Sequence, residues 1–160
     1  MRALLLAALS ISALLSGCGN DSCNDLFGSA GSAFDLGFSE VTVRFIEGET
    51  LEVAYRQADG TRPAVFTAIL RGITPESGLS VDLVENINAD QPGTPEVRRG
   101  SIVRVANDSQ GYDPIEEGTL ELEEWSGVGG DASGSFGVRL EDGRSMTGRF
   151  CGTVTQVGSG

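Results

Sequence analysis

From Phe38 onward, apolar and polar residues alternate with a period of two, which is the pattern of half-buried β-strands. The clearest alternation covers residues 41–45 and 51–55, on either side of a turn around Gly48. The apolar positions are Val41, Val43 and Phe45 in the first segment and Leu51, Val53 and Tyr55 in the second. Because alternate side chains of a strand point to the same face, we expect the two segments to form a hairpin with one apolar face.

Further strands are predicted over residues 63–71, 79–83, 99–106, 119–125, 133–140 and 144–157. The segment 63–71 is apolar almost throughout, as in a strand that is covered on both faces. The best helix candidate is a single turn at Thr74–Ser77, with Thr74 as N-cap and Pro75 in the first position. About eight short strands with regular turn signals predict an all-β fold, a single antiparallel β-sandwich or small barrel.

The last two predicted strands can pair in two registers. A two-residue turn at Asp142-Gly143 would place apolar residues opposite polar ones, whereas a three-residue loop at Glu141–Gly143 would match them. The second register pairs Val138 with Met146, Phe136 with Gly148, and Gly134 with Phe150. A slip of one residue turns every side chain to the other face, so the apolar pattern favours the three-residue loop with Gly143 in the left-handed conformation. Aromatic rings then cover cross-strand glycines.

The chain has 160 residues, enough for about one domain. It contains 23 acidic residues, 11 basic residues that are all arginine, and no histidine, for a net charge of −12. Nucleic-acid binding requires clustered positive charge and is therefore excluded. The lack of histidine removes Ser-His and Cys-His catalytic pairs and imidazole zinc ligands. We expect no enzymatic activity, no metal and no cofactor.

The first residues have the features of an export signal. Arg2 supplies a positive charge, and residues 3–15 form an uncharged apolar run. This run is shorter than the roughly 20 residues needed to span a membrane, but it suits a signal peptide. It ends in Leu15-Ser16-Gly17-Cys18, a lipobox, and with these residues the sequence resembles bacterial lipoproteins.

The resemblance implies that residues 1–17 are removed as a lipoprotein signal peptide and that Cys18 becomes the lipidated first residue of the mature chain. In that family the cysteine carries a diacylglyceryl group and usually an acyl chain on its α-amine, palmitate being a typical chain. Gly19 follows where aspartate would retain a lipoprotein at the inner membrane of Gram-negative bacteria, so the outer membrane is favoured. The alternative is an ordinary secretory signal with an incidental cysteine.

Composition divides the rest of the chain in two. Residues 18–37 are rich in Gly, Ser, Asp and Asn and are expected to form a flexible lead-in, partly ordered where apolar residues dock. Residues 38–160 form the predicted all-β domain. Their last hairpin resembles that of many small bacterial lipoproteins, which implies an all-β domain without indicating an activity.

Two cysteines remain once Cys18 carries lipid. Because the compartment outside the inner membrane is oxidising, we expect Cys23 and Cys151 to form a disulfide. Five positions separate Cys18 from Cys23, so this bond would hold the folded body within about 18 Å of the anchor. The alternatives are two free thiols or an intermolecular bond.

Five carboxylates lie close together, at Glu116, Glu117, Glu121, Glu123 and Glu124. Paired carboxylates can act as acid and base in glycoside hydrolysis. Glu121 and Glu123 alternate with leucines, however, so we expect the row to occupy the polar face of a strand beside Arg139 and Arg149 of the following hairpin.

Two further groups of residues suggest ligand contacts. The loop residues Asn107, Asp108, Ser109 and Asp113 offer oxygen atoms that suit Ca²⁺, but no EF-hand register fits them, so no metal site is predicted. Trp125 and Tyr112, with Tyr55, are candidates for an exposed aromatic platform that binds sugars or peptides, with core packing as the alternative.

These features favour a lipid-anchored protein of the bacterial cell envelope that binds an unidentified protein or glycan, or serves as a structural accessory. The alternative is a hydrolase that uses the Glu116–Glu124 carboxylates on envelope or extracellular polysaccharide. Two carboxylates facing one cleft would favour the hydrolase, whereas a row flanked by arginines on an open sheet would favour binding.

Overall fold

The computed structural model describes residues 23–108 and 110–158. Over this part of the chain, nine β-strands and one short 3-10 helix form. The elements are β1 (Asp25–Phe27), η1 (Ser29–Ser32), β2 (Glu40–Ile46), β3 (Thr50–Arg56), β4 (Arg62–Ile69), β5 (Leu79–Asp82), β6 (Gly100–Val105), β7 (Ile115–Trp125), β8 (Asp131–Leu140) and β9 (Ser145–Val157). The expected all-β fold is therefore confirmed.

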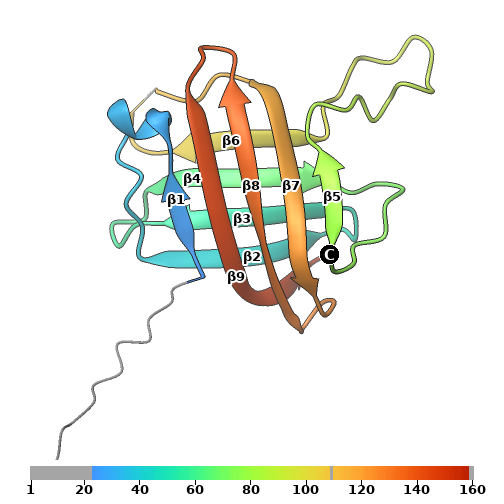
Figure 1. Ribbon diagram of the computed structural model, residues 1–160, viewed down its shortest axis with the longest axis horizontal. Coiled ribbons are helices and arrows are strands. Elements are labelled where there is room, and N and C mark those ends of the chain that lie inside the picture. The colour runs from blue at the N-terminus through green and yellow to red at the C-terminus, as the bar shows by residue number, and fades with distance from the viewer. Residues whose placement is uncertain (1–22, 109, 159–160) are drawn as a thin grey trace, which may run out of the picture.

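Two layers of strands cross at a steep angle, with β7, β8 and β9 in front of β2, β3, β4 and β6 in Figure 1. The strand order is β5-β7-β8-β9-β2-β3-β4-β6, and β1 pairs with β9 off this path. β9 belongs to both layers, because residues 145–153 pair with β8 and residues 154–157 continue beside β2. The β2–β9 pair is parallel, which departs from the purely antiparallel architecture expected from the sequence.

The two ends of the path nearly meet, so the sheet forms an almost closed barrel. Leu83, just after β5, donates its N–H to the carbonyl of Gly118 on β7 (3.0 Å) and accepts the N–H of Gly100 on β6 (2.7 Å). Leu83 thus connects β7 to the start of β6.

The interior of the barrel is a packed core. The rings of Phe66 and Phe136 stack with their centroids 4.2 Å apart, and Tyr55 meets Phe136 edge to face at 6.2 Å. All three side chains are fully buried or nearly so. Small barrels are commonly filled by side chains in this way, so a binding site is expected on the surface of the barrel and not in its interior.

The predicted hairpin of β2 and β3 and the predicted register of β8 and β9 are both confirmed. In β2 and β3, Val43 lies opposite Val53, within the expected apolar face. In β8 and β9, Phe136 lies opposite Gly148, and Gly143 has a φ of 84° in the three-residue loop. The strand predicted over 63–71 is observed as β4, whose residues 63–66 are buried on both faces.

The helical turn predicted at Thr74–Ser77 is wrong, because these residues have no helical structure. The backbone instead makes a tight turn in which Leu79 donates its N–H to the Glu76 carbonyl (3.2 Å), with Gly78 at a φ of 85°. Gly78 also donates to Leu122 on β7 (2.7 Å). Hydrogen bonds to the neighbouring strand therefore outweigh a local capping signal. Thr74 is in addition biased towards extended backbone because it precedes a proline.

The lead-in is structured from Cys23 onward and forms part of the core. Leu26 on β1, Ala30 in η1, Phe34 and Leu36 are all buried. Ser145 donates its N–H to the hydroxyl of Ser29 (2.8 Å), which fastens η1 to the start of β9. This segment docks more fully than its Gly/Ser-rich composition led us to expect.

Candidate functional site

A groove of about 390 Å³ lies where the barrel wall stays open, between β6 and the segment leading into β7. It is lined by Arg98, Gly100–Val103 and Tyr112–Ile115. Ile102 and Ile115 are buried, whereas Val103 is 49% exposed. One of the two candidate ligand contacts, Tyr112, therefore belongs to this groove.

One edge of β6 faces away from its partner β4 and is the end of the strand path. Gly100 donates its N–H away from β4, to Leu83. Because alternate residues of an antiparallel strand direct their backbone groups the same way, Ile102 and Arg104 also present theirs to this edge. In the part of the chain that the structure describes, no other strand pairs with it. Such an edge can accept an extended polypeptide as an added strand.

A cluster of rings and guanidinium groups contacts Tyr112 of the groove. Arg104 and Arg144 lie over the ring of Phe34, with guanidinium carbons 5.2 and 5.0 Å from its centroid, and Tyr112 meets the same ring edge to face at 5.0 Å. The Tyr112 hydroxyl donates to the carbonyl of Pro63 (2.7 Å). The edge-to-face contact with Phe34 and this hydrogen bond thus fix the groove-lining tyrosine.

The carboxylates near this cluster are engaged by its arginines. Asp108 pairs with Arg104, and Asp142 pairs with Arg144. The hydrogen bond from Arg104 lowers the pKa of Asp108, and the one from Arg144 lowers the pKa of Asp142. Asp108 therefore forms an ion pair and is not a free oxygen ligand. Ser109, from the same predicted calcium loop, lies outside the described residues.

The proposed aromatic platform does not form. Trp125 is at the end of β7, half-buried, and meets Phe45 edge to face at 5.4 Å. Tyr55 is fully buried and donates its hydroxyl to the Arg149 carbonyl (2.7 Å). Tyr112 is in the groove, so the structure places the three rings in separate surroundings.

The glutamate row occupies the outer face of β7, as expected. Arg139 of β8 pairs with Glu116 (3.3 Å) and Glu117 (2.6 Å). The prediction that the glutamates also lie beside Arg149 is wrong, because Arg149 is on β9 and β8 separates that strand from β7. Glu121 and Glu123 are exposed and line a shallow depression of about 200 Å³ against Gly78–Ser80.

One buried charge, Arg99, was not predicted from the sequence; this residue is 5% exposed. Its Nε donates to Glu85 (2.9 Å) and its Nη1 to the carbonyl of Ile69 (2.6 Å). Arg99 thereby secures both ends of the loop between β5 and β6 to β4. An arginine at the start of a predicted strand carries no pattern that distinguishes it from a solvated one.

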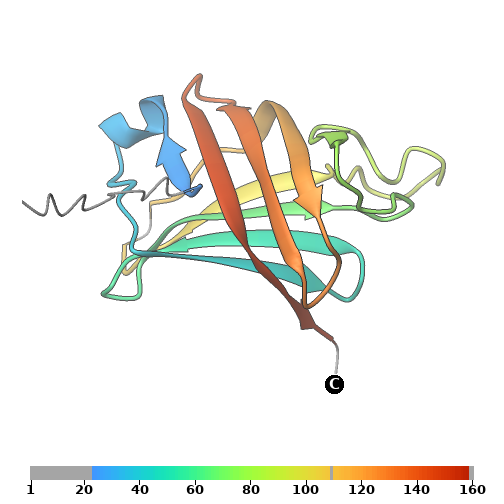
Figure 2. The ribbon, with the colours of Figure 1, turned by 60° about the horizontal axis from the view of Figure 1, so that its bottom comes forward.

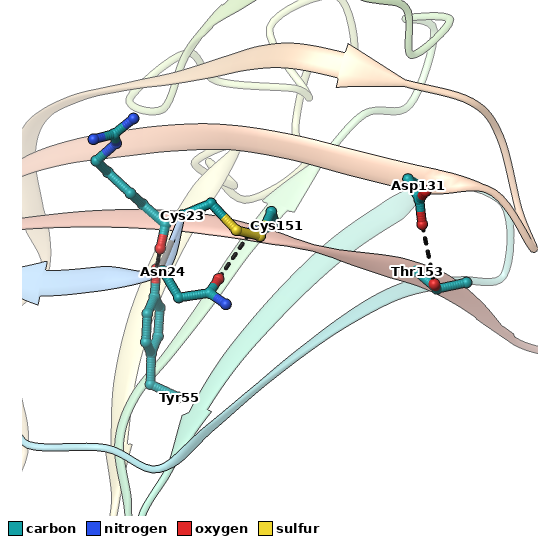
Figure 3. The surroundings of a disulfide bond; sticks show 7 residues. Cys23, Asn24, Tyr55, Asp131, Cys151 and Thr153 are labelled. Carbon is teal, nitrogen blue, oxygen red and sulfur yellow. Dashed lines mark hydrogen bonds between the residues drawn. A yellow bond between two sulfur atoms is a disulfide. The ribbon is translucent and has the colours of Figure 1, made fainter. Parts of the chain in front are cut away.

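The structure pairs Cys23 with Cys151, in agreement with the expected disulfide (Figure 3). Their Cα atoms are 5.7 Å apart, within the usual range for this bond. Cys151 also donates its N–H to the side-chain oxygen of Asn24 (2.8 Å). Cys18, the predicted lipidation site, lies outside the described residues.

Comparisons of the chain with protein-family models, with curated proteins and with solved structures find no match. Residues 23–108 and 110–158 contain no helix with the length and apolar character needed to cross a membrane. The candidate site is therefore defined by geometry alone, as the groove beside β6 with Tyr112 on its rim.

The buried Tyr55 and the half-buried Tyr112 predict a loss of stability at alkaline pH. Burial raises the pKa of Tyr112 to about 12, and burial together with the charge of Asp25 raises the pKa of Tyr55. Unfolded tyrosines lose their protons near about pH 10 while the folded ones keep them, so this stabilisation is complete below that pH and is lost above it. In urea titrations at increasing pH, the free energy of unfolding should fall from about pH 10 upward, by up to about 1.4 kcal/mol per pH unit for each tyrosine.

The matched variant is Tyr55→Phe, which removes the titrating group and keeps the ring. Its dependence on alkaline pH should be shallower than that of the wild-type protein. An unchanged slope in this variant would contradict the assignment.

Proposed function

We propose that the protein is a lipid-anchored component of the bacterial cell envelope, held by acyl chains on Cys18, with the outer membrane as its favoured location. The observation that carries this proposal is the complete lipobox, Leu15-Ser16-Gly17-Cys18. The fold supports it, because a disulfide fastens Cys23, five positions after Cys18, to β9. An exported, oxidising location is where such a bond persists.

Replacing Cys18 by alanine tests the anchor. The Cys18→Ala chain should accumulate as an unprocessed precursor with residues 1–17 attached, because the peptidase of the lipoprotein family acts on the lipidated cysteine. Metabolic labelling with a palmitate analogue, followed by electrophoresis, measures both processing and acylation. Label that persists in the variant would contradict the proposal; Ser16→Ala is the control that keeps the cysteine.

We propose further that the barrel acts by binding and that the groove beside β6 contacts a protein partner. The free β6 edge, the exposed Val103 and the fixed ring of Tyr112 support this role. The alternative is the polysaccharide hydrolase, which is favoured by one observation, the shared depression of Glu121 and Glu123. The row nevertheless lies on an open outer face with Arg139 at one end, which favours binding.

Site-specific photo-crosslinking in intact cells tests the groove. A photoreactive residue at Val103, which is 49% exposed in the groove, should give a discrete higher-mass adduct. The same residue at Val128, 46% exposed and outside the groove, is the matched control and should give none. Equal adducts at both positions, or none at Val103, would exclude the groove as the contact surface.

A further inference from the structure

Figures 1 and 2 both place β1 and η1 at one end of the barrel and the long loop between β5 and β6 at the opposite end. We call the first the β1 end and the loop, residues 84–98, the arm. The arm is folded back on itself, because Ile87 donates its N–H to the carbonyl of Val97 (2.9 Å) and Val97 donates to the side chain of Asn86 (3.1 Å). The arm and the β1 end thus lie at opposite ends of the molecule.

The length of chain before Cys23 limits how the body can turn. At about 3.5 Å per residue, the five positions from Cys18 to Cys23 reach at most about 18 Å. A globular body of about 140 residues has a radius of gyration of about 14 Å and is therefore roughly 37 Å across. The connection is about half as long as the body is wide, so the side that bears Cys23 has to face the surface that holds Cys18.

The β1 end carries a group that suits a phospholipid surface. Phe27 on β1 is 50% exposed. Within the described residues, seven arginines have a carboxylate within ion-pair distance, whereas Arg56, Arg62 and Arg149 have none. Arg56 ends β3, Arg62 begins β4, and Arg149 lies opposite Asp25 of β1, which places all three at this end. Glu40 lies opposite Arg56 and Asp25 opposite Arg149, so carboxylates balance the guanidinium groups at this end. The exposed ring of Phe27 is the group that suits the membrane interface, because aromatic side chains favour it.

We infer that the barrel rests on the phospholipid headgroups with its β1 end, with Phe27 at the interface, and that the arm points away from the membrane. This inference rests on the proposed lipid anchor at Cys18. The whole chain has a net charge of −12, so attraction to anionic lipid does not orient the body; the short connection between Cys18 and Cys23 and the exposed Phe27 do. The arm is then the part of the molecule presented farthest from the membrane.

Depth-dependent quenching of tryptophan fluorescence tests this orientation. The full lipidated chain is reconstituted in phosphatidylethanolamine–phosphatidylglycerol vesicles whose acyl chains are brominated. In a Trp125→Phe background, Phe27→Trp reports on the β1 end and Val97→Trp on the arm. Bromine should reduce the emission from position 27 by about twofold, because an interfacial side chain lies only about 5–10 Å into the headgroup and acyl boundary. Emission from position 97 should not change.

Flotation of the vesicles is measured first, which separates the two proposals. If the protein does not float with the vesicles, the lipid anchor fails and the orientation fails with it. If it floats but positions 27 and 97 are quenched equally, or position 97 more, the orientation alone is wrong. Ala33→Trp and Asp90→Trp form a second reporter pair in exposed segments should the first pair fail to fold.

A length control uses the same reporters. Inserting a Gly/Ser segment of about 20 residues between Cys18 and Cys23 gives a connection with a mean span of about 27 Å, longer than the radius of the body. The body can then turn, so quenching at position 27 should decline towards the value at position 97. Quenching that stays unchanged would show that the surface groups alone orient the body. That result would contradict an orienting role for the short connection.

Discussion

Replacing Cys151 by serine is expected to lower the free energy of unfolding by about 4–5 kcal/mol. The disulfide joins residues 128 positions apart, so it restricts nearly the whole unfolded body. In the chain-entropy model, the stabilisation grows with the length of the closed loop. Domains of this size have total stabilities of about 5–15 kcal/mol, so the change is a large fraction of the total.

Urea unfolding of the mature chain without its anchor measures this effect. With a slope of about 2 kcal/mol/M, the midpoint should fall by about 2 M in Cys151→Ser. Cys23→Ser should give the same shift, and the double variant should be no less stable than either single one, because all three lack the same bond. A wild-type midpoint that does not respond to reductant would contradict the disulfide.

Replacing Gly148 by alanine should destabilise the barrel by about 3 kcal/mol, at the upper end of the usual effect of overpacking. A Cβ at this position would overlap ring carbons of Phe136 and come within 2.7 Å of the Tyr55 hydroxyl. Neither neighbour can move easily, because Phe136 stacks on Phe66 at 4.2 Å and Tyr55 is fully buried.

Gly137→Ala is the matched control for this substitution. Gly137 lies on β8 in the same hairpin, but a Cβ there would meet no atom within 4 Å. Alanine should therefore be neutral or stabilise by about 0.5–1 kcal/mol, since it loses less backbone entropy than glycine on folding. Thermal unfolding followed by circular dichroism compares the two variants. Equal midpoints would show that Phe136 does not pack over Gly148.

Local alternation was sufficient to predict the pairing of strands that are neighbours in the chain. The β8–β9 register follows from the requirement that Phe136 and Phe150 share a face with Val138 and Met146, and one slip of register breaks it. The same holds for β2 and β3 around Gly48.

The closure of the barrel could not be predicted in this way. It depends on contacts between distant segments, such as the parallel run of residues 154–157 beside β2 and the hydrogen bonds of Leu83 to β7 and β6. Such contacts leave no periodic pattern in either segment. The prediction of a helical turn at Thr74–Ser77 was wrong for a related reason. A local capping rule does not take account of the hydrogen bond from Gly78 to Leu122 on β7.

The candidate site was only partly predictable. Tyr112 was singled out as an aromatic residue in a polar loop, but the groove beside it exists only because β6 and β7 separate. The contacts of Arg104 and Arg144 with the ring of Phe34 join three segments that lie far apart in the sequence. Pairing of Arg139 with Glu116 and Glu117 was predictable because β7 and β8 are consecutive strands.

We propose that Cys18 carries a lipid that holds the barrel close to a membrane. The most direct test of this proposal is mass spectrometry of the N-terminal peptide from the wild-type protein, extracted with detergent from membranes of a bacterium that makes the full chain and digested without reduction. We expect a chain that begins at Cys18 and bears diacylglyceryl and acyl groups, with Cys23 linked to Cys151. A chain that begins at another residue, or at Cys18 without the added lipid mass, would contradict it.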